Sequence, residues 1–172
     1  GIVTDSDLLN ASPSEATTLS VWEINYLLSK ITVERVMSKN VITTCESCPI
    51  EEAARVMADH KIGGLPVIEG DKLVGIITET DIFHIFLEML GARNSGVRLT
   101  VELLDSPGKL RELASAIADI GGNIDGLGII LGASTETRLM MVKVTHVTLE
   151  QLEAAVKPVV EKIVDLRNVK ST

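Results

Sequence analysis

The stretch Gly75–Phe83, GIITETDIF, decides how this chain folds, because it has a close copy at Gly1–Leu9, GIVTDSDLL. Both copies run through glycine, two β-branched residues, threonine, an acid, a hydroxyl residue, aspartate and two large apolar residues. Matching residue classes in the same order throughout are unlikely to arise by chance. The chain therefore contains an internal repeat.

Each copy is typical of a strand that turns into a helix. Ile76 and Ile77 extend the apolar run from residue 73, which favours a buried strand, and a helix-like apolar pattern follows over residues 82–90. Thr78 then lies at the helix N-cap and Asp81 in the first turn. In a structural interpretation the two form a capping box, in which the hydroxyl accepts from a first-turn amide and the carboxylate accepts from the cap's own amide.

The same corner can also hold a ligand, because a helix N-terminus offers unused amide donors and partial positive charge. Gly-x-x-Thr-x-x-Asp followed by apolar residues, present twice, resembles the end of the CBS domain. CBS domains are regulatory modules that work as tandem pairs and commonly bind adenosine-containing ligands. The resemblance implies that the threonine contacts a phosphate or equivalent group and that the aspartate holds the ribose. It assigns these sites to Thr4, Asp7, Ile77, Thr78 and Asp81.

The resemblance also divides the front part of the chain. Residues 1–12 match the C-terminal end of a first CBS repeat, residues 13–31 a linking helix, and residues 32–92 a complete second repeat. We expect upstream residues to be missing, since the first copy keeps only its last strand and helix. In the second repeat we expect a strand over 41–44, a helix with Pro49 at its first position, and strands over 65–68 and 73–78, with Pro66 at a strand start or edge. The implied adenine pocket is walled by Ile42, Thr43, Leu65 and Pro66.

The segment 91–96, GARNSG, is small, polar and flexible, and predicts a domain boundary. Beyond it, alternating apolar residues predict a half-buried strand over 97–103, followed by a helix with Ser106 at its N-cap and Gly121-Gly122 at its end. Strands over 123–131 and 138–144, a helix capped by Thr148 and Gln151, and a last strand over 159–169 complete the order βαββαβ. This order is the ferredoxin-like fold.

A second resemblance lies in this part of the chain. Asp105-x-Pro107-Gly108-x-Leu110 followed by Gly122-Asn123-Ile124 resembles the signature of ACT domains, small regulatory modules that often bind amino acids at a domain interface. The resemblance assigns residues 97–172 to an ACT domain and implies amino-acid-binding positions at Asp105, Ser106, Pro107, Gly108, Asn123 and Ile124. Turn geometry explains the same residues without a ligand, and ACT-like domains can serve only for dimerisation. A CBS pair followed by an ACT domain resembles the acetoin-utilisation protein B family.

The expected fold class is therefore α/β (α+β), with CBS-type βαββα modules followed by a ferredoxin-like βαββαβ ACT domain. Composition agrees, because hydrophobic residues make up 45% of the chain but aromatic residues only 2%, so the cores must be aliphatic. A net charge of −8 argues against a nucleic-acid partner. No apolar run approaches the roughly 18 residues that span a bilayer, so no membrane is expected and a cytoplasmic location follows as the default.

Little in the sequence suggests catalysis. Cys45 and Cys48 form an isolated Cys-x-x-Cys, whereas a metal site would need a second pair or nearby histidines, and only His60 is close. A helix N-terminus would favour a Cys48 thiolate, which leaves redox chemistry open beside the favoured structural role. No nucleophile elbow, metal-ligand cluster or phosphate-transfer loop is visible. We therefore expect no catalytic residue, no metal and no cofactor other than a regulatory ligand.

The leading hypothesis is a homodimeric regulatory protein that senses a small-molecule effector and acts on an unidentified protein target. A ligand-free dimerisation scaffold and, more remotely, a Cys-x-x-Cys redox enzyme are the alternatives. Acids or hydroxyl residues, never bases, stand between threonine and aspartate in both copies. A carboxylate about 4 Å from a phosphate costs on the order of 1 kcal/mol in water and up to ~4 kcal/mol in a partly buried site. AMP, adenosine or S-adenosylmethionine is thus favoured over ATP.

Overall fold

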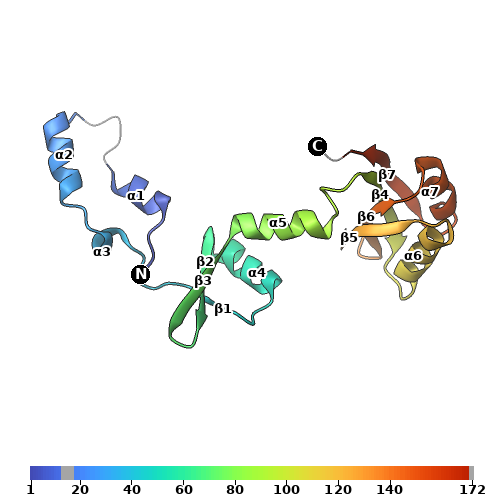
Figure 1. The fold of residues 1–172 in the computed structure, drawn as a ribbon, viewed down its shortest axis with the longest axis horizontal. Helices are drawn as coiled ribbons and strands as arrows, with labels where there is room; N and C mark the ends of the chain where they lie inside the picture. Colours follow the sequence, from blue (N-terminus) through green and yellow to red (C-terminus); the bar gives the residue numbers. More distant parts are fainter. Residues whose placement is uncertain (13–17, 171–172) are drawn as a thin grey trace. The chain divides into compact units, whose positions relative to one another are not determined.

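The computed structural model describes residues 1–12 and 18–170 (Figure 1). It divides into two compact units, residues 1–77 and 78–172. The fold is of the mixed α+β class and has two sheets, as predicted. Residues 13–17 of the predicted linking helix and residues 171–172 of the predicted ACT domain lie outside the described residues.

Among the described residues of the first unit, three helices precede the sheet: α1 (Asp5–Ala11), α2 (Val21–Ser29) and α3 (Val33–Val36). No residue of these helices is buried, so the described part of the predicted linking helix covers no core in this chain. Ile2 forms an isolated antiparallel bridge with Ser38, through Ile2 N–H to Ser38 O at 3.1 Å and Ser38 N–H to Ile2 O at 2.9 Å.

The sheet of the first unit has the order β1-β2-β3, with β1 (Thr44–Cys45), β2 (Gly64–Glu69) and β3 (Lys72–Thr78). The predicted strand over 41–44 is wrong, because β1 begins only at Thr44. The parallel register pairs Thr44 with Val67, which would place Thr43 beside Pro66. Proline has no N–H to donate, so the ladder ends there. Pro66 therefore lies within the central strand, immediately before its pairing with β1 begins, and not at a sheet edge.

One amphipathic helix, α4 (Ile50–His60), supplies the core of this unit. Ala53 and Met57 are buried on one face of α4, and Leu65 of β2 is fully buried. Pro49 is the N-cap of α4, one position before the predicted first helical residue. A one-residue difference at a helix end is within the ordinary spread of boundary assignments.

The second unit begins with α5 (Glu79–Met89) and continues through β4 (Gly96–Leu104), α6 (Lys109–Asp119), β5 (Asn123–Leu131), β6 (Thr137–Thr145), α7 (Leu149–Val156) and β7 (Lys162–Val169). The four strands form an antiparallel sheet in the order β5-β6-β4-β7, the ferredoxin-like arrangement. Alternate residues of β4, from Val97 to Leu103, are buried against α6 and α7. The two helices therefore cover the same face of the sheet (Figure 1).

The helix ends of this unit follow local sequence with one exception. Gly121 has φ 79° directly after the C-cap of α6, and Thr148 and Gln151 form the capping box of α7, both as predicted. The predicted N-cap at Ser106 is wrong, because α6 begins at Lys109 behind Gly108. Gly108 has φ 95°, a left-handed conformation that glycine adopts without steric cost, and this turn delays the helix.

The longest helices of residues 1–12 and 18–170 have 11 residues, against about 20 needed to cross a bilayer. No helix in this described part of the chain is therefore long and apolar enough to be a membrane span.

Candidate functional site

Both threonine–aspartate corners form capping boxes. Asp81 Oδ2 accepts from the Thr78 N–H at 2.8 Å and from the Thr78 hydroxyl at 2.6 Å, while the Asp81 N–H donates to Thr78 Oγ1 at 3.4 Å. The corresponding distances between Thr4 and Asp7 are 2.8, 2.7 and 3.4 Å. The two copies of the repeat thus have the same local geometry.

These hydrogen bonds fix the charge of the corner. The Thr78 hydroxyl, followed by the Thr78 amide, lowers the pKa of Asp81, and Thr4 lowers the pKa of Asp7 in the same way. Both carboxyl groups are therefore ionised at neutral pH. Each uses only Oδ2 in its capping box, and Oδ1 of Asp81 accepts no hydrogen bond from the described residues. This oxygen is an acceptor of the kind that a ribose diol needs.

Capping geometry alone does not identify a ligand site. Glu23 Oε2 accepts from the Ser20 N–H at 2.8 Å and from the Ser20 hydroxyl at 2.7 Å, in a helix that has no predicted ligand. Thr148 and Gln151 form the same arrangement with a neutral amide. The structural interpretation of the Thr78 and Asp81 pair is therefore confirmed, and the ligand interpretation stays a prediction.

The first unit contains an open apolar cavity of about 640 Å³. Its walls include Thr43 and Pro66, two of the predicted adenine-pocket residues. Ile77, the last residue of this unit, is half-buried and is not part of the lining. The full lining comprises Gly1, Ile2, Val41, Thr43, Pro66, Ile68, Leu73, Val74, Gly75 and Ile76. A volume of this size suits a nucleoside, since small-molecule pockets measure ~300–1,000 Å³.

The other two predicted wall residues do not line this cavity. Leu65 is fully buried, because successive side chains of a strand point to opposite faces and Pro66 takes the cavity side. Ile42 is half-buried outside the lining. Sequence reasoning missed Ile68 and the residues of β3 instead. The alternation of β2 was the available signal, since Ile68 lies two residues after Pro66 and hence on the same face.

The predicted ACT ligand residues fall into two groups. Asp105 pairs with Arg138 at 2.6 Å, and Ser106, Pro107 and Gly108 form the turn behind it. Asn123 donates from Nδ2 to Asp125 Oδ1 at 2.6 Å, and Ile124 packs against the core of the unit.

These two groups lie at opposite ends of the sheet. The register pairs Leu104 with Thr137 at one end, and Asn123 with Thr145 at the other. Thr137 and Thr145 are eight residues apart on β6, and strands rise about 3.4 Å per residue, so the groups are separated by roughly 27 Å. Within one chain, no single amino acid can touch both.

The cysteines and the described acids do not build a metal centre. Cys45 and Cys48 are joined in a disulfide, so neither offers a thiolate in this state. Residues 1–12 and 18–170 contain no cluster of three or more histidine, cysteine, aspartate or glutamate side chains placed to hold a metal ion.

Comparison with known proteins identifies one domain. Residues 33–88 match the family model described as CBS domain. A CBS domain lies in this chain. An inosine-5′-monophosphate dehydrogenase of Korarchaeum cryptofilum is 41% identical over 61 residues, and an L-aspartate semialdehyde sulfurtransferase of Methanocaldococcus jannaschii is 37% identical over 71 residues. These matches cover 36% and 40% of this chain but only 13% and 14% of the two relatives.

A CBS domain-containing protein of Dictyostelium discoideum is 31% identical over 91 residues, which is 52% of this chain and 63% of that protein. Among solved structures, a CBS domain pair in complex with 5′-methylthioadenosine and S-adenosyl-L-methionine is 35% identical, with a TM-score of 0.33, over 40% of this chain and 57% of that one. A hexameric CBS-CP12 protein is 21% identical, with a TM-score of 0.37, over 69% and 57% of the two chains.

Proposed function

We propose that this chain is a ligand-sensing regulatory protein that binds an adenosyl compound through its CBS part. The observation that carries the proposal is the CBS domain over residues 33–88, which includes the Thr78-x-x-Asp81 corner. Asp81 is ionised and keeps Oδ1 available, so it can accept from both hydroxyls of a ribose. The cavity beside Thr43 and Pro66 offers the apolar surface that a purine ring requires.

The charge of the corner narrows the ligand to AMP, adenosine or S-adenosylmethionine rather than ATP. Glu79 and Asp81 lie in the first turn of α5, and that turn contains no lysine or arginine. A triphosphate would face this uncompensated negative charge, whereas a sulfonium would be attracted to it. The matched enzymes share only a small part of their length with this chain, so their reactions are not carried over. We keep the prediction that the chain itself is not an enzyme.

For the second unit we propose an ACT domain that dimerises the protein or senses an amino acid. The βαββαβ order and the Asp105–Gly108 turn support this assignment. An amino acid that touches both Asp105 and Asn123 must lie between two copies of the chain, because the two residues occupy opposite ends of one sheet. Amino-acid sensing at these residues therefore requires a homodimer. The order of CBS and ACT domains further suggests a protein of the acetoin-utilisation type.

The substitution Asp81→Asn tests adenosyl binding with little risk to the fold. Gln151 already supports a capping box with a neutral amide, so asparagine at position 81 can keep the helix start. It removes the ionised acceptor that the ribose needs. Glu23→Gln makes the equivalent change in α2, at a capping box with no proposed ligand, and serves as the matched control.

Binding is measured by calorimetry with AMP, adenosine, S-adenosylmethionine, 5′-methylthioadenosine and ATP. We expect at least one of the first four to bind, Asp81→Asn to weaken it at least about tenfold, and Glu23→Gln to bind as the parent protein does. Unchanged affinity in Asp81→Asn would remove the proposed role of this carboxylate.

The second candidate function is a ligand-free dimerisation scaffold. One observation favours it: the Thr78–Asp81 box is geometrically equal to the Ser20–Glu23 box and needs no ligand to be satisfied. If the protein is a scaffold, calorimetry will detect no binding of any adenosyl compound, while light scattering will give the mass of a dimer at micromolar protein concentration. Binding together with a monomer mass would favour the sensor over the scaffold.

A further inference from the structure

A row of three cations crosses the face of the second unit's sheet that α6 and α7 leave uncovered. The register places Arg98 of β4 directly between Lys143 of β6 and Arg167 of β7. Val97 and Leu99 point into the core, so Arg98 and its two neighbours point to the opposite face. Like charges directly opposite one another on neighbouring strands are destabilising. The row therefore needs compensating negative charge.

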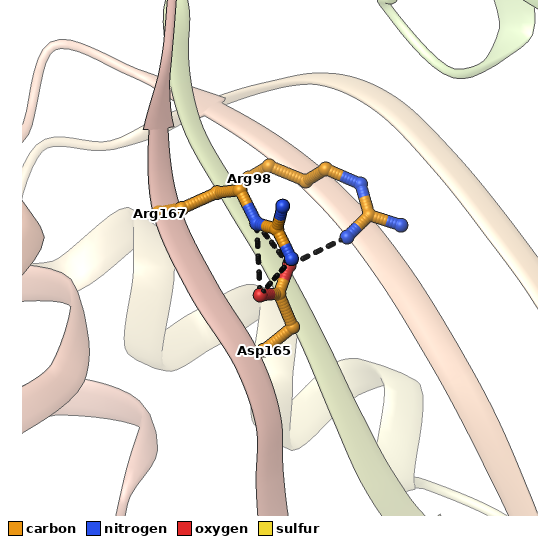
Figure 2. Close-up of polar contacts among 3 residues, drawn as sticks. All are labelled: Arg98, Asp165 and Arg167. Atoms are coloured by element: carbon orange, nitrogen blue, oxygen red, sulfur yellow. Dashed lines mark hydrogen bonds and ion pairs between the residues drawn. The ribbon is translucent and has the colours of Figure 1, made fainter.

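One carboxylate supplies part of that charge. Asp165 accepts from Arg167 Nε at 2.8 and 2.9 Å and from Arg98 Nη1 at 2.7 Å, and Figure 2 shows both guanidinium groups directed at it. A single negative charge between two arginines leaves one positive charge over. Only Nη1 of Arg98 is engaged by a described residue, so its other nitrogens can still donate.

Lys143 has no such partner. Its residue surface is only 4% exposed, yet its ammonium group makes no hydrogen bond or ion pair with residues 1–12 or 18–170. Burial, followed by repulsion from Arg98, lowers the pKa of Lys143. Asp125 opposes that shift, but its oxygens already accept from Asn94, Asn123 and Thr145.

The segment after α5 covers the lysine. A methyl group added at Gly91 would come within 3.2 Å of Lys143 Cγ, so the backbone of this segment lies directly against the lysine stem. An ammonium group that lies beside an arginine and makes no ion pair of its own attracts an anion. The stem of Lys143 therefore lies under protein backbone, and the carboxylate of Asp125 balances part of the charge on its ammonium group.

Lys143 and Arg98 line a cavity of about 190 Å³ within this unit. The other five lining residues are apolar: Leu90, Ala92, Met141, Val142 and Val169. At ~30 Å³ for each water molecule in the liquid, the cavity corresponds to about six small groups. A four-carbon carboxylate has about that many non-hydrogen atoms. Inorganic phosphate, polar on every side, would leave oxygens unpaired against the apolar walls.

We propose that this cavity binds a short-chain aliphatic carboxylate, with the carboxylate group between Lys143 and Arg98 and the hydrocarbon part against the apolar walls. The site is separate from the Asp81 corner and from the Asp105–Gly108 turn, and it does not depend on the proposed adenosyl binding. The second unit would thus bind a ligand that is chemically different from an adenosyl compound, at a site formed by a single chain.

The test uses the full chain, labelled with ¹⁵N and titrated with butyrate at constant ionic strength. Butyramide has the same size without the charge, and inorganic phosphate has the charge without the hydrocarbon part. We expect saturable shifts of the Arg98, Met141 and Lys143 amides, with a dissociation constant on the order of 1 mM for so small a ligand. Butyramide should cause no saturable shift, and phosphate should fail to compete with butyrate.

Three variants complete the test. Lys143→Met should weaken butyrate binding at least about tenfold, and Arg98→Gln several-fold. Lys162→Met, which removes an exposed lysine from the same sheet, should leave the affinity unchanged. The spectrum of each variant reports whether it is folded. The proposal would be overturned if butyrate and butyramide bound equally well, or if phosphate bound better than butyrate. It would also be overturned if Lys143→Met left the affinity for butyrate unchanged, or if butyrate caused no saturable shift at concentrations up to about 50-fold above the expected dissociation constant.

Discussion

Replacing Gly126 with alanine tests how closely the segment after α5 lies on the sheet of the second unit. A Cβ atom added at Gly126 would collide with the backbone of Leu90 and Gly91, including Leu90 O at 2.7 Å. Backbone atoms cannot escape by changing rotamer, so the whole segment would have to move. Gly128, on the same strand, provides the matched control, because its added Cβ would meet only the side-chain ends of Leu90 and Met141, at 2.8 and 3.3 Å.

The expected difference between the two variants follows from these contacts. Both substitutions reduce the entropy of the unfolded chain equally, a gain of about 0.4–1 kcal/mol where the native backbone accepts alanine. Overpacking against backbone costs about 1–3 kcal/mol, whereas a flexible side-chain end gives way at little cost. Gly126→Ala should therefore be about 2 kcal/mol less stable than Gly128→Ala. For a unit of this size, that difference lowers the melting temperature by roughly 8–16 °C.

Far-UV circular dichroism during thermal and urea unfolding is the appropriate assay. The single Trp and the single Tyr of the chain both lie in α2, so fluorescence reports on the first unit and not on this one. Amide hydrogen exchange of β4 and β6 assigns the loss to the second unit. If the two variants melt within about 2 °C of each other, the segment after α5 does not lie on β5 as described. The contact between Gly91 and the stem of Lys143 would then be refuted as well.

Two further predictions concern charge. Lys143→Met should stabilise the second unit, because it removes a desolvated positive charge beside Arg98. As the pH rises from the lowered pKa of Lys143 toward 10.5, the parent protein should gain stability relative to this variant, because within that window the unfolded chain binds more protons than the folded one. Parallel pH profiles of urea midpoints for parent and variant would show that folding does not lower the pKa of Lys143. Hydrogen bonds from Arg167 are the main cause of the lowered pKa of Asp165 in the folded protein. The stability that Asp165 contributes is therefore fully present above pH 3.8, the ordinary pKa of aspartate, and is lost as the pH falls through the lowered pKa of the folded state. Asp165→Asn should flatten the acid limb of the unfolding profile, and an unchanged limb would show that the two arginines do not hold this carboxylate.

The strands of the second unit were predictable because their apolar residues alternate. Val97, Leu99, Val101 and Leu103 are all buried, as that alternation requires. The predicted 123–131 strand coincides with β5, whereas the start of α6 was misplaced. Ser106 and Pro107 satisfy the ordinary preferences of a helix start, but Gly108 takes a left-handed conformation that these preferences do not reveal.

The candidate CBS site was predictable to the extent that it is local. Thr78 and Asp81 are three residues apart, and their capping box depends on nothing beyond the first turn of α5. The cavity walls depend on which face of β2 each residue takes, so Leu65 was assigned to the ligand although it is buried in the core. The sequence indicated the special position of Lys143 only weakly, as a charged residue within the apolar run of β6. Its burial could not be predicted, because the backbone that covers its stem, at Gly91, belongs to a segment far away in the sequence.

Features that act over a few residues follow from the amino-acid sequence alone: the duplicated threonine–aspartate corner, the helix caps at Thr148 and Gly121, and the alternation that selects the core face of β4. The strand register, in contrast, is known only from the folded chain, and this register places Lys143, Arg98 and Arg167 side by side. Capping and alternation need only neighbouring backbone. Register depends on the packing of whole strands, because a shift of one residue would turn every core side chain to the opposite face.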